Sequence, residues 1–252
     1  MEAVIEQFSS LRDLGVILSD DGNFSEHVDH VCKKVRQKIG WLLRTFSKRE
    51  NWFMKQIFNS LVQPHIDYCS QLWLPNKAGE MEKIEKLLKD FTARIPWLRE
   101  ESYWKTLEIL KMNSEERRLE RYRIIYTWKV LEGLVPNCGI ETVGDKNSPE
   151  EETDRLGRRC KVPKTKSLRK SQREQSFQVG GPKLFNSLPS SVRNITKCSI
   201  EDFKEKLDNF LTNIPDEPKI GGLIPGASDQ LTAGPSNSIP DQIKRIGLGS
   251  WS

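Results

Sequence analysis

Reactive side chains are concentrated in the stretch LVQPHIDYCSQLWLPN, which runs from Leu61 to Asn76. His65 and Cys69 stand four residues apart, a spacing that places two side chains on one face of a helix. Cysteine nucleophiles are activated by a histidine, but that chemistry also needs an acid that orients the histidine and an oxyanion hole. Asp67 is the only acid at hand and nothing in the stretch supplies the oxyanion hole. We therefore interpret the stretch as a packing element in which Cys69 acts as a small hydrophobe.

His27, His30 and Cys32 are the nearest approach to a metal-binding pattern. A zinc site needs four converging ligands, usually grouped as close pairs. The chain has 3 histidines and 5 cysteines, and no two cysteines form a CxxC pair. We predict no metal site and no cofactor. The odd number of scattered cysteines does not indicate a disulfide framework either.

Asp20 and Asp21 in ILSDDGNF are the third candidate, because paired carboxylates after a strand can hold magnesium for phosphoryl transfer. A polymerase site of that kind also needs an aspartate from a second, separated motif, and only about twenty residues precede this pair. Asp-Asp-Gly is common turn chemistry. We predict a turn here, no catalytic residue and no small-molecule substrate.

Basic residues are unevenly distributed, although the formal net charge is only +5. One group lies on a predicted helix after Ser25, and a second lies between Arg155 and Arg173, where no acidic residue intervenes. Lysine and arginine side chains that neutralise phosphates supply the sequence-independent part of nucleic-acid affinity. A solvated helix face and a solvated loop are the alternative interpretation. The candidate nucleic-acid-binding residues are Lys33, Lys34, Arg36, Lys38, Arg158, Arg159, Lys161, Lys164, Lys166, Arg169 and Lys170.

Aromatic residues near the first basic group offer a second kind of contact. Trp41 and Trp52 could stack on bases. Their helical spacing relative to apolar neighbours favours a place in the core instead.

Apolar residues recurring at spacings of three and four predict a mainly α fold. We expect residues 1–24 to contain one strand, Leu14–Leu18, with its turn, and residues 25–135 to form a helical bundle. A basic flexible linker is predicted for 136–176, a helical unit for 177–212, and a disordered tail for 213–252. The sequence also allows a second short strand at Phe177–Val179.

Local signals refine the expected helices. Ser25, Ser102, Ser114 and Ser199 are predicted N-caps. Pro64 should kink or break its helix, because it lacks an amide donor and clashes with the preceding turn. In the helix after Ser114, the arginines are expected on the exposed side. These are Arg117, Arg118, Arg121 and Arg123.

The chain shows no signal for a membrane. No run approaches the roughly 18 apolar residues of a membrane span, and the first residues lack the pattern of a signal peptide. We expect an intracellular protein, in the nucleus or the cytoplasm. The segment KVPKTKSLRK is a candidate nuclear-localisation signal.

Four stretches, in this order, resemble the region downstream of the polymerase palm in reverse transcriptases of non-LTR retrotransposons, such as jockey-like elements. The likeness spans roughly Leu11 to Leu211. It implies that the helices from Ser25 to Pro96 correspond to the thumb of an RNA-directed DNA polymerase, which grips the RNA template and the growing DNA. The catalytic palm is not covered. The stretches are DLGVILSDDGNFSEHVDHV, SLVQPHIDYCSQLWLP, IEKLLKDFTARIPWL and FQVGGPKLFNSLPSSVRNITKCSIEDFKEKLDNFL.

Three hypotheses follow for function. The first is a nucleic-acid-binding remnant of such a reverse transcriptase, which binds RNA or an RNA–DNA hybrid and is not catalytic alone. The second is a helical protein–protein adaptor that binds a protein partner through exposed apolar helix faces. The third is a transposon-derived fragment without a selected function.

Overall fold

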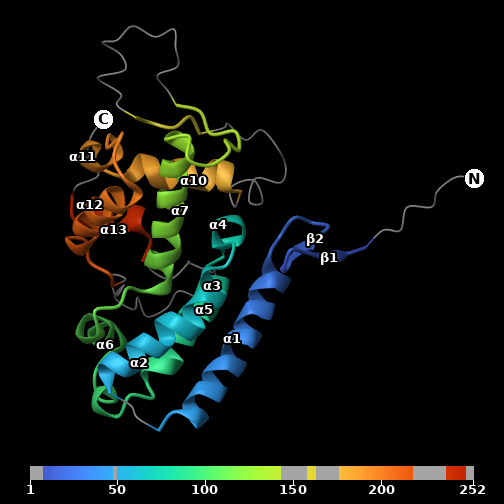
Figure 1. Ribbon diagram of the computed structural model, residues 1–252, viewed down its shortest axis with the longest axis vertical. Coiled ribbons are helices and arrows are strands. Elements are labelled where there is room, and N and C mark those ends of the chain that lie inside the picture. The colour runs from blue at the N-terminus through green and yellow to red at the C-terminus, as the bar shows by residue number, and fades with distance from the viewer. Residues whose placement is uncertain are drawn as a thin grey trace, which may run out of the picture. The chain divides into compact units, whose positions relative to one another are not determined.

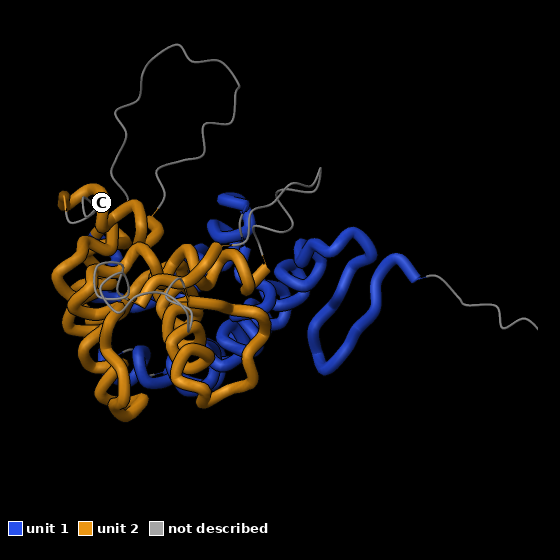
Figure 2. The backbone as a smooth tube through the Cα atoms, turned by 90° about the horizontal axis from the view of Figure 1, so that it is seen from above, with its two compact units in different colours: residues 1–101 blue, residues 102–252 orange. Residues whose placement is uncertain are grey.

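The computed structural model describes residues 8–47, 50–75, 77–142, 158–162, 176–217 and 237–247. These residues are mainly α-helical, with one short two-stranded sheet near the N-terminus (Figure 1), which confirms the predicted fold class. The chain divides into two compact units between Glu101 and Ser102 (Figure 2). The helices predicted to form one body from 25 to 135 therefore fall into both units.

Unit 1 opens with a β-hairpin rather than with the single predicted strand. β1 (Ser10–Asp13) pairs with β2 (Val16–Ser19) in antiparallel register. Leu14 and Gly15, which were assigned to the strand, form the connecting turn with φ of 43° and 87°. Two-residue hairpin turns with both central residues at positive φ match the twist of the flanking strands, and glycine adopts this conformation without steric cost.

α1 (Ser25–Thr45) is the longest helix of unit 1 and packs beside α5 (Ala78–Thr92), as Figure 1 shows. The predicted apolar stripe of α1 is buried. Ser25 is the first residue of the helix rather than its cap, since Phe24 occupies the cap position and makes no side-chain cap bond. The Ser25 hydroxyl instead donates to the Glu80 carboxylate of α5.

The helix around Pro64 bends without ending there. α2 (Asn51–Ile57) continues through a π-helical turn, η1 (Phe58–Val62), into α3 (Gln63–Asp67). A π-turn widens the helix just before Pro64 and so accommodates a residue that has no amide donor. The chain leaves α3 at Cys69, which has a left-handed φ of 53°, and forms α4 (Ser70–Trp73). A 3-10 turn, η2 (Pro96–Leu98), follows α5.

In unit 2, α7 (Glu115–Leu131) has helices packed along its length (Figure 1). α10 (Phe177–Ser187) and α12 (Ile200–Thr212) pack on α7, while α13 (Ile239–Arg245) packs on α10 and α11 (Ser190–Arg193) packs on α12. α6 (Tyr103–Leu110) precedes α7 in the chain. Trp128 of α7 stacks on Phe203 of α12 with ring centroids 4.4 Å apart. The predicted caps Ser102, Ser114 and Ser199 are confirmed, because each hydroxyl accepts a backbone N–H three residues on.

The arginines of α7 are not on an exposed side, so that prediction was wrong. Arg117 and Arg123 are each only 2% exposed, and Arg118 and Arg121 are half-buried. The Arg117 guanidinium donates to the carbonyls of Leu211 and Ile214, at 3.1 and 2.8 Å. Helices packed on several sides of α7 leave it no continuous solvated face, so its charged residues must find partners inside the unit.

Phe177–Val179 is helical and opens α10, so the strand considered there is wrong. The helix lies close against α7, and Gly181 is where they meet. A Cβ at this glycine would stand 2.7 Å from the Thr127 hydroxyl. Tertiary packing against α7 therefore decides the structure of a segment whose local sequence is ambiguous.

Part of the predicted disordered tail is ordered. Residues 237–247 carry α13, and its Ile239 and Ile243 are 0% and 2% exposed in the core of unit 2. Ile239 N–H donates to the Glu120 carboxylate at 2.6 Å. Two apolar anchors and a buried acceptor on another helix fix a segment that composition alone marks as disordered. The rest of that tail from 218 on lies outside the described residues.

The Glu120 carboxyl, which accepts the first N–H of α13, has an unusually high pKa. Burial raises the pKa of the Glu120 carboxyl to about 8, with Glu116 and Asp241 adding to the rise. The Ile239 N–H and Arg123 oppose the rise. The pKa of Glu120 is higher in the folded protein than in the unfolded chain, so the folded protein binds the proton more tightly. The contribution of Glu120 to stability is therefore full below about pH 4.5 and is lost as the pH rises through 8.

The predicted linker also has described parts. Asn137–Thr142 and Arg158–Val162 lie against unit 2, and Thr142 pairs with Cys160 in an isolated antiparallel bridge. The Asn186 side chain holds Cys160 through both its backbone groups, at 2.8 Å each. These two described parts of the predicted linker are therefore held within unit 2.

We expect Ile239→Ala to loosen α13 from unit 2. Removing a fully buried isoleucine costs about 2–4 kcal/mol. Hydrogen exchange should show faster exchange of the α13 amides, and urea unfolding should show a lower free energy of unfolding. Lys244→Ala is the matched control, because that side chain is 74% exposed and its removal should cost less than about 0.5 kcal/mol. Equal exchange in both variants would contradict the docking of α13.

Candidate nucleic-acid interface

The first predicted group of basic residues forms an exposed face of α1. Lys33, Lys34 and Arg36 are exposed and Lys38 is half-buried. α1 has no acidic residue after Asp29. Within the described part of the chain, none of the four makes an ion pair with an acidic side chain. The structure therefore presents these charges to solvent, as a phosphate-binding face requires. We call these residues, with Trp41, the α1 face.

Trp41 belongs to the α1 face and not to the core, which corrects the interpretation from spacing. Its side chain is 47% exposed, because Ile39 and Leu42 take the inward positions of this turn. The Lys38 ammonium lies 5.2 Å from the centroid of the Trp41 ring. Trp52 is likewise exposed, at 68%, and its indole N–H donates to Glu50 at 2.6 Å. Both tryptophan side chains are therefore largely in contact with solvent.

His65, from the stretch with the reactive side chains, lies beside this face. Burial lowers the pKa of His65, and the charges of Lys34 and Lys38 lower it further. The imidazole is therefore neutral at physiological pH. It supplies a polar edge next to two lysines rather than a third charge.

The remainder of that stretch serves structure. The Tyr68 hydroxyl donates to the Leu14 carbonyl of the hairpin turn at 2.8 Å, and the Trp73 indole donates to the Tyr68 carbonyl at 2.8 Å. Trp73 is fully buried, whereas Tyr68 and Leu72 are 53% and 46% exposed. The packing interpretation holds for Trp73 but not for those two side chains, since the helix breaks at Cys69.

The described residues of the second basic group are less exposed or more engaged in ion pairs than the sequence predicted. Arg158 is 16% exposed in its side chain, pairs with Glu132 at 2.5 Å and donates to the Ile195 carbonyl at 3.2 Å. Arg158 therefore braces unit 2 and is not an available phosphate contact. Arg159 is half-buried, and Lys161 pairs with Glu141 at 3.3 Å in an exposed pair. Lys164, Lys166, Arg169 and Lys170 lie outside the described residues.

The candidate metal ligands are used for packing. His27 is 2% exposed, accepts the Ile17 N–H on Nδ1 at 3.3 Å and meets the Trp73 ring edge-on at 5.2 Å. Cys32 is buried among apolar side chains of α1. Among the described residues, no three histidine, cysteine or acidic side chains converge on a point that could hold a metal ion.

Asp20 and Asp21 lie in the exposed turn between β2 and α1. Gly22 N–H donates to the Ser19 carbonyl at 2.9 Å, and Asn23 N–H donates to the Asp21 carboxylate at 3.0 Å. The Asp21 carboxylate thus closes an Asx-type turn, in the way aspartate commonly does.

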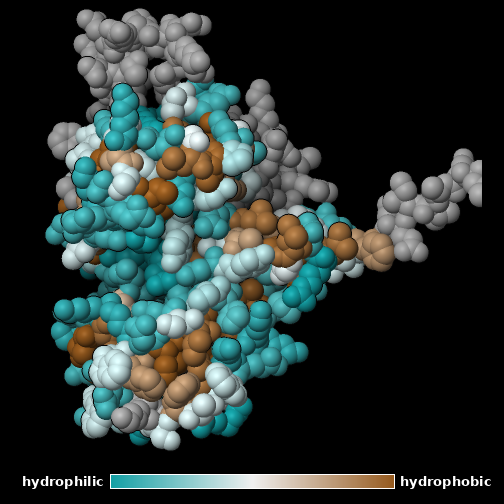
Figure 3. Space-filling model, in the orientation of Figure 1, coloured by the Kyte–Doolittle hydropathy of each residue, from teal (hydrophilic) through white to brown (hydrophobic). Residues whose placement is uncertain are grey.

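Apolar side chains also reach the surface of unit 1. Brown areas interrupt the hydrophilic surface in Figure 3. On the hairpin, Leu11 and Leu18 stand opposite each other and are 59% and 37% exposed. Trp97 after α5 is 70% exposed. No helix in the described ranges has the length and apolar character needed to cross a membrane.

Comparison with known proteins adds one partial match. An uncharacterized protein of Caenorhabditis elegans is 25% identical to this chain over 88 residues, which are 35% of the chain and 44% of that protein. The chain thus spans less than half the length of the curated relative it matches. No family model matches the sequence, and no solved structure matches the fold.

We expect Arg158→Glu to destabilise unit 2. The variant removes the hydrogen bond to Ile195 and sets a second carboxylate beside Glu132, so the cost should be about 3 kcal/mol. Lys161→Glu is the matched control, because its exposed pair contributes less than about 1 kcal/mol. Thermal unfolding followed by circular dichroism compares them. Equal midpoints would show that Arg158 has no bracing role.

The stability of unit 1 should fall in acid through His27. Burial, with smaller contributions from His30 and Arg12, lowers the pKa of His27 from 6.5 to about 4. The unfolded chain therefore binds a proton first, so the contribution is full above about pH 6.5 and is lost as the pH falls through 4. The full effect is roughly 3 kcal/mol.

Urea unfolding at pH 7 and pH 4.5 measures this dependence. His27→Gln should flatten it relative to the wild type, whereas His30→Gln, at a half-buried position on the same helix, should not. If His27→Gln shows the same pH dependence of the free energy of unfolding as the wild type, that dependence arises from groups other than His27.

Proposed function

We propose that this chain is a nucleic-acid-binding protein that derives from the thumb and C-terminal region of a non-LTR retrotransposon reverse transcriptase and is not catalytic by itself. Its ligand is RNA or an RNA–DNA hybrid, held mainly by its phosphate backbone. The resemblance of four ordered stretches suggests the origin. The α1 face is the observation that carries the function.

Electrostatics favour this use of the α1 face. Five basic residues lie between His30 and Thr45 of α1 without an acidic residue among them. Lys33, Lys34 and Arg36 extend from a single turn of one helix, so their backbone positions hold a fixed spacing. Each side chain that meets a phosphate releases condensed counterions, which makes affinity depend on salt.

Trp41 adds a contact that a solvated helix face does not need. Leaving a large aromatic ring half in water forgoes the free energy of its burial. A nucleobase stacked on the ring recovers it, and such stacking is tolerant of base identity. The neighbouring Lys38 can serve the adjacent phosphate while it remains near the ring. The α1 face therefore combines charge and stacking within two helical turns.

A protein–protein adaptor is the second candidate function. It is favoured by the exposed apolar side chains of unit 1, Leu11 and Leu18 on the hairpin and the tryptophans at 52 and 97. Leu11 and Leu18 are neighbours across the hairpin, and contiguous exposed apolar residues mark surfaces that bind partners. This candidate predicts binding that is insensitive to salt and does not need the basic residues of α1.

Reversing Lys33, Lys34 and Arg36 to Glu together tests the nucleic-acid function. For a single strand, each phosphate contact contributes about 0.7 to the slope of log affinity against log salt, so the triple variant should lower that slope by about 2. Fluorescence anisotropy with two unrelated RNA sequences measures it, and both should weaken alike. Lys86, Lys89 and Arg99 reversed to Glu form the control, because they are exposed residues of unit 1 outside α1.

Trp41→Ala separates stacking from charge. It should weaken binding about tenfold and leave the salt slope unchanged. Binding that shows no salt dependence in the wild type, or that survives the triple reversal at equal strength, would put the adaptor function first.

A further inference from the structure

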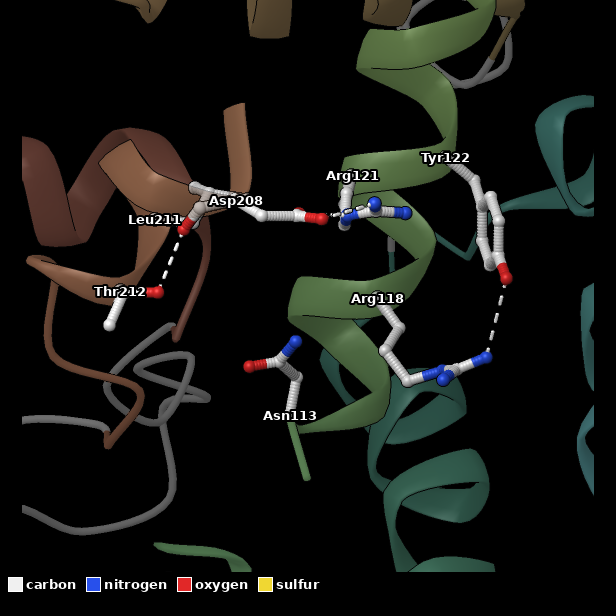
Figure 4. A pocket seen from close by; sticks show the side chains of 7 residues that line it. All are labelled: Asn113, Arg118, Arg121, Tyr122, Asp208, Leu211 and Thr212. Carbon is white, nitrogen blue, oxygen red and sulfur yellow. Dashed lines mark hydrogen bonds and ion pairs between the residues drawn. The ribbon is translucent and has the colours of Figure 1, made fainter. Parts of the chain in front are cut away.

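A hollow that side chains do not fill lies between α7 and α12 of unit 2. Its volume is about 180 Å³. Figure 4 shows two arginines of α7 on one side and residues of α12 on the other. Most of the residues around it are polar or charged. The lining residues are Asn113, Arg118, Arg121, Tyr122, Asp208, Leu211 and Thr212.

The guanidinium groups of the hollow are held in place by their neighbours. Arg121 donates from Nε and Nη2 to the two oxygens of Asp208, the second at 2.7 Å. The guanidinium carbons of Arg118 and Arg121 lie 5.7 and 5.9 Å from the centroid of the Tyr122 ring. Side chains that are already ordered lose little conformational entropy when a ligand binds.

The charges around the hollow leave a positive lining. Arg118 and Arg121 face one lining carboxylate, that of Asp208, which Arg121 engages and which is 47% exposed. Glu115 lies 3.9 Å from Arg118, but its side chain is fully buried and is not part of the lining. An anion in the hollow would therefore meet two guanidinium groups that already have acidic partners, Arg121 with Asp208 in the lining and Arg118 with the buried Glu115.

We propose that this hollow binds a phosphate monoester, either a free nucleotide or phosphate-bearing metabolite or the phosphorylated end of a nucleic acid. Guanidinium groups match phosphate oxygens in geometry and charge. Figure 4 shows Arg118 directed toward Tyr122, Arg121 joined to Asp208, and the Asn113 amide on the other side of α7 from Arg118. A tetrahedral phosphate can accept hydrogen bonds from several directions at once. A planar carboxylate would satisfy fewer of these donors. The proposal concerns unit 2 and does not depend on the function of the α1 face.

Three variants of the full chain test the site by isothermal titration calorimetry with inorganic phosphate and with AMP. Arg118→Gln removes one charged donor and should weaken binding about tenfold. Lys206→Gln, which removes an equal charge from an exposed position of α12, should bind like the wild type. Asp208→Asn removes the competing carboxylate and should tighten binding severalfold, provided that its thermal unfolding shows a folded protein. A bracing role alone would not produce this gain.

Matched oligonucleotides distinguish the two sources of the phosphate, a nucleic-acid end and a free phosphate-bearing ligand. A 5′-phosphorylated ten-residue strand that binds more tightly than its 5′-hydroxyl counterpart, with the difference lost in Arg118→Gln, identifies a nucleic-acid end. Binding of AMP and inorganic phosphate without that difference identifies a free phosphate ligand. The proposal fails if the wild type binds neither small probe nor the 5′-phosphate, or if Arg118→Gln binds all probes as the wild type does. It also fails if folded Asp208→Asn loses binding.

Discussion

Unit 2 depends on one constraint, which is that the charges buried by α7 must be neutralised inside the protein. Arg117 meets it by donating to the carbonyls of Leu211 and Ile214. Carbonyls at the last turn of a helix have no partner within the helix, so this guanidinium caps α12. Asp216 completes the arrangement, because it lies 3.4 Å from Arg117 and accepts both the Ser114 N–H and hydroxyl. The start of α7 and the end of α12 thereby cap each other.

The same network reaches the end of the chain. Asn237 donates its side-chain amide to Asp216 at 2.8 Å and to Ser114 at 3.1 Å, just before α13 begins. Glu120 then accepts the first amide of α13. Removing one partner from such a network leaves a buried charge unpaired, which costs several kcal/mol. The attachment of α13 therefore follows from these polar partners on α7, among them the Glu120 carboxyl, as much as from its two isoleucines.

In unit 1, by contrast, the charged residues of α1 remain at the surface. α1 uses a single apolar stripe for packing, so its lysines and arginines remain in water at little energetic cost. A surface of this kind adds nothing to folding and is available to a ligand. Residues of unit 1 with reactive side chains instead take part in packing and hydrogen bonds. His27, for example, accepts the Ile17 N–H and packs against the Trp73 ring. This contrast is the physical basis of the proposal that unit 1 binds a ligand through the α1 face.

The sequence by itself determined the features that depend on neighbours along the chain. Apolar spacing located α1, α5 and α12, serine caps located the starts of α6 and α7, and the Asp-Asp-Gly turn was placed correctly. The charges of the α1 face were also predictable, because a helix with one buried stripe must expose the other residues.

Tertiary structure alone decided which polar residues became internal. Arg117 and Arg158 look like solvated charges in sequence, but carbonyls and carboxylates distant in the chain neutralise them. The order of α13 and the hollow beside Arg118 have the same origin, since both need groups from helices separated by about ninety residues or more. Local sequence does not record such partners, and the free energy of burying a charge is set by the partner it finds.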